Sequence, residues 1–225
     1  DLINQFNCTP EKIVTQNLSP FLPHKLNELK ETNFSDVYSK FDFDKNKRWF
    51  FYPAQFWSHK NHVYLLNALK VIISKKSNNI GFIFCGRDKG NLSFIKNKIS
   101  EFNLHNYIKV LGHISDEELI SIYKCSQGTV IPTYLGRSSL PLLESIYFNK
   151  KIFYSKNILD DSLKPYVVEF DLKDANDLAN KLIDYSNNPK DVNFEYEQIN
   201  PSKLFQNNYK IIIDEFRAFL NTWKK

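Results

Sequence analysis

The chain has 225 residues and a mass of 26.6 kDa, which leaves room for one large domain or two small ones around a sizeable core. Apolar residues at 42% and charged residues at 24% exclude a disordered chain or a fibrous repeat. The longest apolar runs fall far short of the roughly 18 residues that a membrane span needs. The sequence contains no Met, so we expect Asp1 to be a processed terminus or the cut edge of something longer.

The cysteines and the charges suggest a compartment and a ligand class. Cys8, Cys85 and Cys125 are odd in number and widely spaced, a pattern that favours a reducing compartment, so we expect a cytoplasmic protein. The net charge is +5, and the segment from Lys45 to Arg87 holds many basic residues without one Asp or Glu. This segment is either a basic field for a phosphorylated ligand, nucleic acid or anionic membrane, or a solvated lysine-rich face.

Strand-type and helix-type patterns alternate along the chain, after a polar segment with one expected helical turn at 35–41. Apolar runs predict strands at 49–54, 80–85, 107–111, 128–132, 152–154 and 167–170. Helical spacing predicts helices at 65–73, 94–102, from 115 onward, at 140–148, 175–185 and about 202–223. Ser115 and Glu118 have the spacing of a capping box, which marks the start of one of these helices.

Strands that alternate with amphipathic helices imply an α/β fold with a parallel sheet covered on both faces. Right-handed crossovers then give a Rossmann-like, doubly wound sandwich. Ligands of such folds bind at the carboxyl ends of the strands. This rule selects four loops before any motif is considered, at 55–62, 86–90, 112–115 and 133–139.

The loop at 133–139 joins a predicted strand to a predicted helix. The free amides in the first turn of a helix bind anions, and this interaction contributes ~0.3–1 kcal/mol of binding free energy at an exposed site. Arg137 adds a fork of donors suited to phosphate. Ser138 and Ser139 are candidates both for the helix cap and for ligand contact. Glu144 lies inside the helix, where a solvated carboxylate competes with one that accepts hydrogen bonds from ligand hydroxyls.

The loop at 55–62 places Lys60 just ahead of a helix, where its charge can reach a phosphate at the same sheet edge. His59 and His62 are spaced like a metal pair, but no third ligand is suggested nearby, so we expect no metal site. The sequence Asp42-Phe43-Asp44 has the form of a metal-binding DxD motif. It sits in a linker rather than after a strand, and we interpret it as surface.

At these residues the chain resembles the carboxyl-terminal half of a family four glycosyltransferase, a retaining enzyme of the two-Rossmann-domain GT-B type. Four segments match in order, and the resemblance covers nearly the whole chain. They are 9–17 at the end of the first domain, 52–62 around the diphosphate-binding lysine, 111–119 beside the nucleotide base and 132–144 in the donor loop.

The resemblance implies a role for individual residues. Lys60 would neutralise the leaving nucleoside diphosphate, and Glu144, the second glutamate of the family's EX7E motif, would hold the ribose hydroxyls. Both are expected catalytic residues, and the amides from Arg137 to Leu140 would meet the phosphates. The implied nucleotide-sugar site comprises Gln55, Lys60, Gly86, Arg87, His113, Gly136, Arg137, Ser138, Ser139, Leu140 and Glu144.

Two positions depart from the family pattern. Gly136 stands where the first glutamate of the motif is expected, which puts the usual contact to the donor sugar in doubt. Gln55 stands where many members have a phosphate-binding arginine, and Arg137 is a candidate to replace that charge.

The reaction implied by the resemblance transfers a sugar from a nucleoside-diphosphate sugar to a hydroxyl with retention, without a metal or cofactor. The product would be a surface polysaccharide or lipid-linked glycan, and the acceptor would bind mostly to an amino-terminal domain absent here. We expect residues 1–47 to hold the end of that domain and a linker, 48–200 the nucleotide-sugar-binding domain, and 201–225 a crossover helix. We expect the isolated chain to be poorly active.

Three alternatives remain at this stage. Gly136 favours a catalytically silent nucleotide-sugar-binding or assembly module. The aromatic residues Trp49, Phe50, Tyr52 and Trp57 within the basic segment fit nucleic-acid binding, but aromatic residues in a strand pattern are more often core, so we expect no nucleic acid. The apolar face of the final helix suits either a membrane surface or, as we favour, a globular surface.

Overall fold

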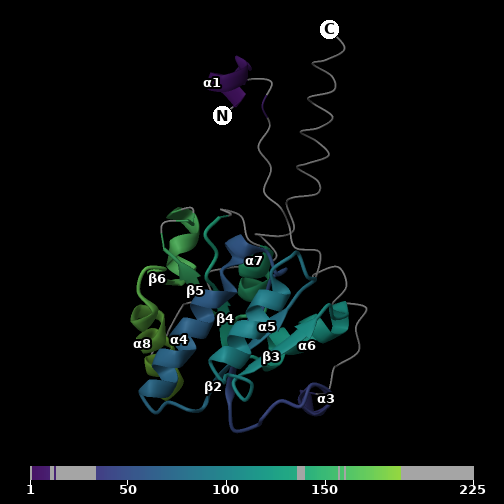
Figure 1. The fold of residues 1–225 in the computed structure, drawn as a ribbon. Helices are drawn as coiled ribbons and strands as arrows, with labels where there is room; N and C mark the ends of the chain where they lie inside the picture. The colour runs from purple at the N-terminus through teal and green to yellow at the C-terminus, as the bar shows by residue number, and fades with distance from the viewer. Residues whose placement is uncertain are drawn as a thin grey trace.

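The computed structural model describes residues 2–10, 13, 34–135, 140–156, 158–159 and 161–188 (Figure 1). It confirms the predicted α/β fold with one parallel sheet, whose strand order is β3-β2-β1-β4-β5-β6. This is the order of a doubly wound Rossmann sheet. The strands are β1 (Arg48–Pro53), β2 (Ile80–Cys85), β3 (Ile108–Gly112), β4 (Gly128–Ile131), β5 (Lys151–Ser155) and β6 (Val168–Phe170).

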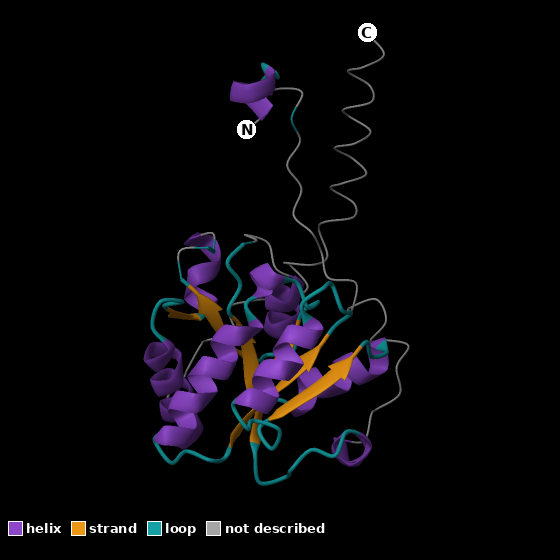
Figure 2. Ribbon diagram, in the orientation of Figure 1, coloured by secondary structure: helices purple, strands orange, loops and turns teal. Residues whose placement is uncertain are grey.

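Helices lie on both sides of the sheet (Figure 2). The elements are α1 (Leu2–Phe6), α3 (Phe34–Lys40), η2 (Ser58–Lys60), α4 (His62–Ser74), α5 (Leu92–Glu101), α6 (Asp116–Cys125), α7 (Leu140–Tyr147), η3 (Asp161–Tyr166) and α8 (Ala175–Asn187). The expected capping box is present, because the Ser115 hydroxyl accepts from the Glu118 amide and the Glu118 carboxylate accepts from the Ser115 amide. The sequence did not predict η3, a short turn that contains Pro165. The predicted helix at 202–223 lies outside the described residues.

The central strands bury side chains on both faces, as a parallel sheet requires. On β1, Phe50 and Tyr52 point into a core covered by α4, α5 and α8, whereas Trp49 and Phe51 point into a second core beneath α3 and α6. The alternation explains why β1 reads as an unbroken apolar run. Of the aromatic residues considered for nucleic-acid binding, Trp49, Phe50 and Tyr52 are therefore core residues.

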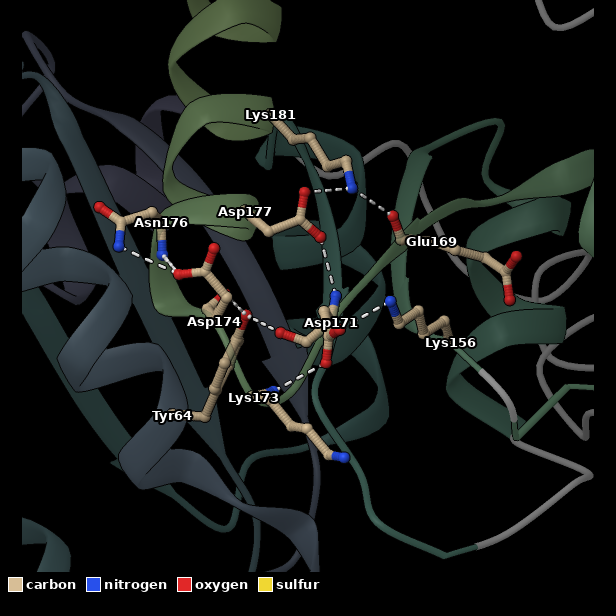
Figure 3. Close-up of polar contacts among 9 residues, drawn as sticks. All are labelled: Tyr64, Lys156, Glu169, Asp171, Lys173, Asp174, Asn176, Asp177 and Lys181. Atoms are coloured by element: carbon tan, nitrogen blue, oxygen red, sulfur yellow. Dashed lines mark hydrogen bonds and ion pairs between the residues drawn. The ribbon is translucent and has the colours of Figure 1, made fainter.

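A network of polar contacts fixes the turn between β6 and α8 against α4 (Figure 3). The Tyr64 hydroxyl on α4 lies 2.8 Å from the Asp171 carbonyl oxygen and 2.9 Å from that of Asp174. On α8, Lys181 donates to the Glu169 carbonyl and to the Asp177 carboxylate, whose other oxygen accepts from the Asp171 amide. Helix α4 is therefore fixed to a segment more than a hundred residues later in the chain.

Among the described residues, no helix is long and apolar enough to cross a membrane. Residues before β1 also contribute to the second core, because Val37 on α3 and Phe43 after it are buried there. The boundaries predicted at 47 and 200 stay predictions.

Gly81 on β2 lies opposite Trp49 on β1, and the indole ring occupies the space that a side chain would need. A Cβ atom at Gly81 would lie 2.5 Å from a ring carbon of the buried Trp49. We expect Gly81→Ala to lower the free energy of unfolding by about 1–3 kcal/mol, because the fully buried ring has to shift. Urea titration followed by circular dichroism measures this change.

The control is Ser93→Ala on the exposed side of α5, for which we expect a change of no more than about 0.5 kcal/mol. Equal stability of Gly81→Ala and the parent protein would contradict the packing described for the two central strands.

Candidate functional site

The carboxyl ends of the strands meet at one edge of the sheet, and the chain leaves β1 and β4 there in opposite directions. From β1 it crosses to β2 and β3, and from β4 it crosses to β5 and β6. In open parallel sheets the ligand crevice forms at this reversal of strand order. The described parts of the loops predicted to carry the site lie along this edge.

Backbone hydrogen bonds connect the loops that follow β1, β2 and β3. The Ala54 amide donates to the Cys85 carbonyl, and the Gly86 amide donates to the Gly112 carbonyl at 2.7 Å. Gly86 has φ of 150°, and a Cβ atom on it would lie 2.3 Å from the Ala54 carbonyl oxygen. Only glycine fits there, so the predicted residue Gly86 shapes the edge of the sheet through its backbone.

Lys60 ends the η2 turn, and two neighbouring strands hold the backbone of that turn. The Tyr52 hydroxyl donates to the Lys60 carbonyl at 2.8 Å. The preceding carbonyl, that of His59, accepts from the Tyr134 amide at 2.9 Å and from the Thr133 hydroxyl at 3.3 Å. The loop after β1 is therefore attached to the loop after β4.

The Lys60 side chain is half-buried, and burial lowers the pKa of its ammonium group. Within the described ranges, no carboxylate forms an ion pair with it. A cation that is partly removed from water and lacks an acidic partner is suited to bind an anionic ligand.

A pocket of about 200 Å³ opens at the reversal point between β1 and β4. It brings together two predicted residues, Gln55 and Lys60, with Trp57, whose indole N–H donates to the Gln55 side-chain oxygen at 3.1 Å. The other lining residues are Tyr52, Pro53, Ala54, Ile131 and Pro141.

Glu144 is on α7, and its carboxylate accepts a hydrogen bond of 2.7 Å from the Tyr123 hydroxyl on α6. Burial raises the pKa of the Glu144 carboxyl, and the negative charge of Asp116 raises it further, whereas the bond from Tyr123 lowers it. The solvated alternative for Glu144 is therefore wrong: the carboxylate is largely buried and has one specific partner.

Arg87 and His113 follow β2 and β3, and both side chains are exposed. The Arg87 guanidinium lies 3.4 Å from the His113 ring nitrogen Nε2. The structure thus brings these two predicted residues together at the edge of the sheet. Predicted residue Leu140 is the first residue of α7 and is 41% exposed, and Gly136, Arg137, Ser138 and Ser139 lie outside the described residues.

The two histidines considered as a metal pair have different surroundings. His62 is fully buried against the rings of Phe56, Tyr52 and Phe84, and burial lowers its pKa to about 3. His59 is half-buried and stacks on Trp57. The described ranges contain no group of three His, Cys, Asp or Glu residues that could hold a metal ion.

Sequence reasoning missed two residues of this region. Trp57 was grouped with the core aromatic residues, yet it is 43% exposed and lines the pocket. Its place after the β1 strand, in a polar loop, was the available signal. Tyr123 lies in an ordinary helical pattern, and nothing in the sequence indicated that its hydroxyl reaches Glu144.

Two of the solved structures with a similar fold are glycosyltransferases. The glycosyltransferase from Rickettsia africae ESF-5 superposes with a TM-score of 0.74 at 18% identity, over 97% of this chain and 60% of that one. Anabaena Alr3699/HepE in complex with UDP superposes with a TM-score of 0.66 at 14% identity, over 83% of this chain and 54% of that one. WaaG, a glycosyltransferase involved in lipopolysaccharide biosynthesis, superposes with a TM-score of 0.65 at 13% identity, over 80% of this chain and 50% of that one.

The chain therefore spans between half and 60% of the length of these proteins, and it has the fold of one Rossmann-like half of a GT-B enzyme. No curated protein matches the sequence. The family model described as "Glycosyl transferases group 1" matches residues 35–199, which is most of the chain. The chain belongs to the group 1 family of glycosyl transferases.

Proposed function

We propose that this protein is the donor-binding half of a retaining glycosyltransferase. It binds a nucleoside-diphosphate sugar at the pocket between β1 and β4, and the sugar passes to a hydroxyl of a surface polysaccharide or lipid-linked acceptor. The observation that carries the proposal is the half-buried Lys60, which has no acidic partner among the described residues and lines a pocket at the reversal of strand order. We place the acceptor on a further domain, as the length of the solved relatives suggests.

The chemistry follows from the charge that develops during transfer. When the bond between sugar and diphosphate breaks, negative charge accumulates on the departing diphosphate. A cation already fixed at that place stabilises the transition state without reorganisation. Lys60 meets this requirement, because its backbone is held by Tyr52 and its neighbour His59 by the β4 loop.

The other residues at the edge receive distinct parts of the donor. We assign the base to the ends of β2 and β3, beside Arg87 and His113, and the ribose hydroxyls to Glu144. A largely buried carboxylate with one oxygen that no described side chain contacts is suited to accept hydrogen bonds from hydroxyls. Two features support a nucleoside diphosphate as the ligand class: the UDP complex of the similar Anabaena protein and the position of Lys60.

A second candidate is a catalytically silent nucleotide-sugar-binding module, which Gly136 favours because it replaces the first glutamate of the family motif. Incubating the full-length protein with UDP-glucose and measuring released UDP separates the two. Release of UDP above the spontaneous rate supports the enzyme, whereas tight binding without release supports the silent module.

We expect Lys60→Ala to weaken UDP binding by on the order of 10- to 100-fold, because it removes a charge-assisted contact to phosphate. Isothermal titration calorimetry with UDP, and with guanosine diphosphate in parallel, measures the dissociation constants. Lys96→Ala, on the exposed side of α5, removes the same charge away from the pocket and should bind like the parent protein. Equal losses in the two variants would mean that only net charge matters.

We expect UDP affinity to fall at acid pH, starting at a higher pH than an ordinary glutamate would give. The ionised carboxylate accepts the ribose hydroxyls, and burial raises the pKa of Glu144, so protonation removes the acceptor early as pH falls. Glu144→Gln should bind UDP more weakly and lose this part of the pH profile. The titration of the ligand's own phosphate is common to both proteins, and exposed Glu101→Gln provides the control. A parallel decline in parent and Glu144→Gln would contradict this role.

We expect EDTA to leave the UDP dissociation constant unchanged, because Lys60 and the amides at the sheet edge are assigned the charge neutralisation that a metal supplies in other transferases. The measurement compares titrations of chelator-treated protein with and without added Mg²⁺ or Mn²⁺. Tighter binding by tenfold or more on adding either ion would show that a metal takes part.

A further inference from the structure

The surroundings of Glu144 assign a role to a residue that does not line the pocket. We propose that Tyr123 is a positioning residue, whose hydroxyl holds one carboxylate oxygen of Glu144 and thereby presents the other oxygen to the hydroxyl groups of the donor. The inference rests on the proposed function, in which Glu144 binds the ribose.

The hydrogen bond joins two helices that follow different strands. Tyr123 is near the end of α6, Glu144 is in α7, and the hydroxyl donates to the Oε2 atom of the carboxylate at 2.7 Å. This distance is typical of an O–H donor to an ionised oxygen, which is among the stronger hydrogen bonds in proteins. No other described side chain donates to this carboxylate, which leaves Oε1 as its second acceptor.

The packing around the Tyr123 ring fixes the position of its hydroxyl. Tyr123 is completely buried. Its ring meets the Phe51 ring of β1 edge-to-face, with centroids 5.0 Å apart, and stacks on the Phe148 ring at 5.0 Å. Aromatic contacts on two sides fix the ring plane, so the direction of the hydroxyl is set by the core rather than by the ligand.

The charges around Glu144 make this single hydroxyl important. Among the described residues, the groups that act on the carboxyl are Tyr123 and Asp116 from α6 and the Cys85 thiol from the end of β2. No Lys or Arg of the described part of the chain forms an ion pair with Glu144. Burial and Asp116 both oppose ionisation, and among the described residues that act on the carboxyl only Tyr123 favours it, by lowering its pKa.

The tyrosine stays a donor throughout the neutral range. Burial holds the pKa of its hydroxyl well above the usual value, and the negative charge of Glu144 raises it further. Tyr64 offers a contrast, since its hydroxyl shares its one proton between two backbone carbonyls of the β6–α8 turn and does not contact a residue assigned to the donor. These two tyrosines therefore make a matched pair.

The test compares Tyr123→Phe with Tyr64→Phe, because each substitution removes one buried hydroxyl and keeps the ring. Calorimetry measures the affinity for UDP and for 2′,3′-dideoxy-UDP between pH 5 and pH 8. We expect Tyr123→Phe to bind UDP about tenfold more weakly at neutral pH and dideoxy-UDP like the parent. Its UDP profile should shift to higher pH, since the carboxyl loses the bond that lowers its pKa. Tyr64→Phe should change neither the affinities nor the profile.

The outcomes distinguish a failure of the role proposed for Glu144 from a failure of the role proposed for Tyr123. If Glu144→Gln binds UDP like the parent, the proposed role of Glu144 is wrong. If Glu144→Gln loses affinity while Tyr123→Phe keeps the affinity and pH profile of the parent, Glu144 binds the ligand but Tyr123 does not position it. Should Tyr123→Phe fail to fold, site-specific 3-fluorotyrosine at position 123 strengthens the donor with little change of shape. It should shift the UDP profile to lower pH, and an unshifted profile would overturn the proposal.

Discussion

The site depends on the position of β1 in the middle of the sheet, paired with β2 on one edge and with β4 on the other. Its pairing with β2 runs along the whole strand, whereas its pairing with β4 is confined to Phe50 and Phe51. Because the chain leaves β1 and β4 in opposite directions, a crevice forms between the ends of the two strands. The pocket with Lys60 is a geometric result of this reversal.

Burial at this edge has opposite effects on the two predicted catalytic residues. It lowers the pKa of Lys60 and raises that of Glu144, so each charged form is less favoured than it would be in water. A ligand whose phosphate binds Lys60 and whose hydroxyls bind Glu144 would replace part of the hydration that both groups have lost. Perturbed groups cluster at functional sites, although burial also shifts the pKa of Lys150 and Lys151, which lie away from this edge.

The sequence predicted the sheet and most helices because their signals are local. Alternating burial on β1 and β2 appears as apolar runs, and the Ser115 capping box needs only residues within one turn. Lys60 and Gln55, which line one pocket, could be proposed as site residues because the carboxyl-end rule turns a strand prediction into a site prediction. Contacts between distant elements left no local signal. The exposure of Trp57 depends on where its loop lies, and the bond from Tyr123 to Glu144 depends on how α6 packs beside α7.

The hydroxyl of Tyr64 has a consequence for the order in which the protein assembles. A nascent chain that has reached Glu144 already contains every residue assigned to the donor, but the carbonyls that anchor α4 belong to Asp171 and Asp174. Contacts of such large sequence separation form late, after much of the chain entropy has been lost. The anchoring of α4 therefore awaits residues that are not assigned to the donor, and a chain cut before Asp171 would lack this support of α4 rather than an assigned ligand group.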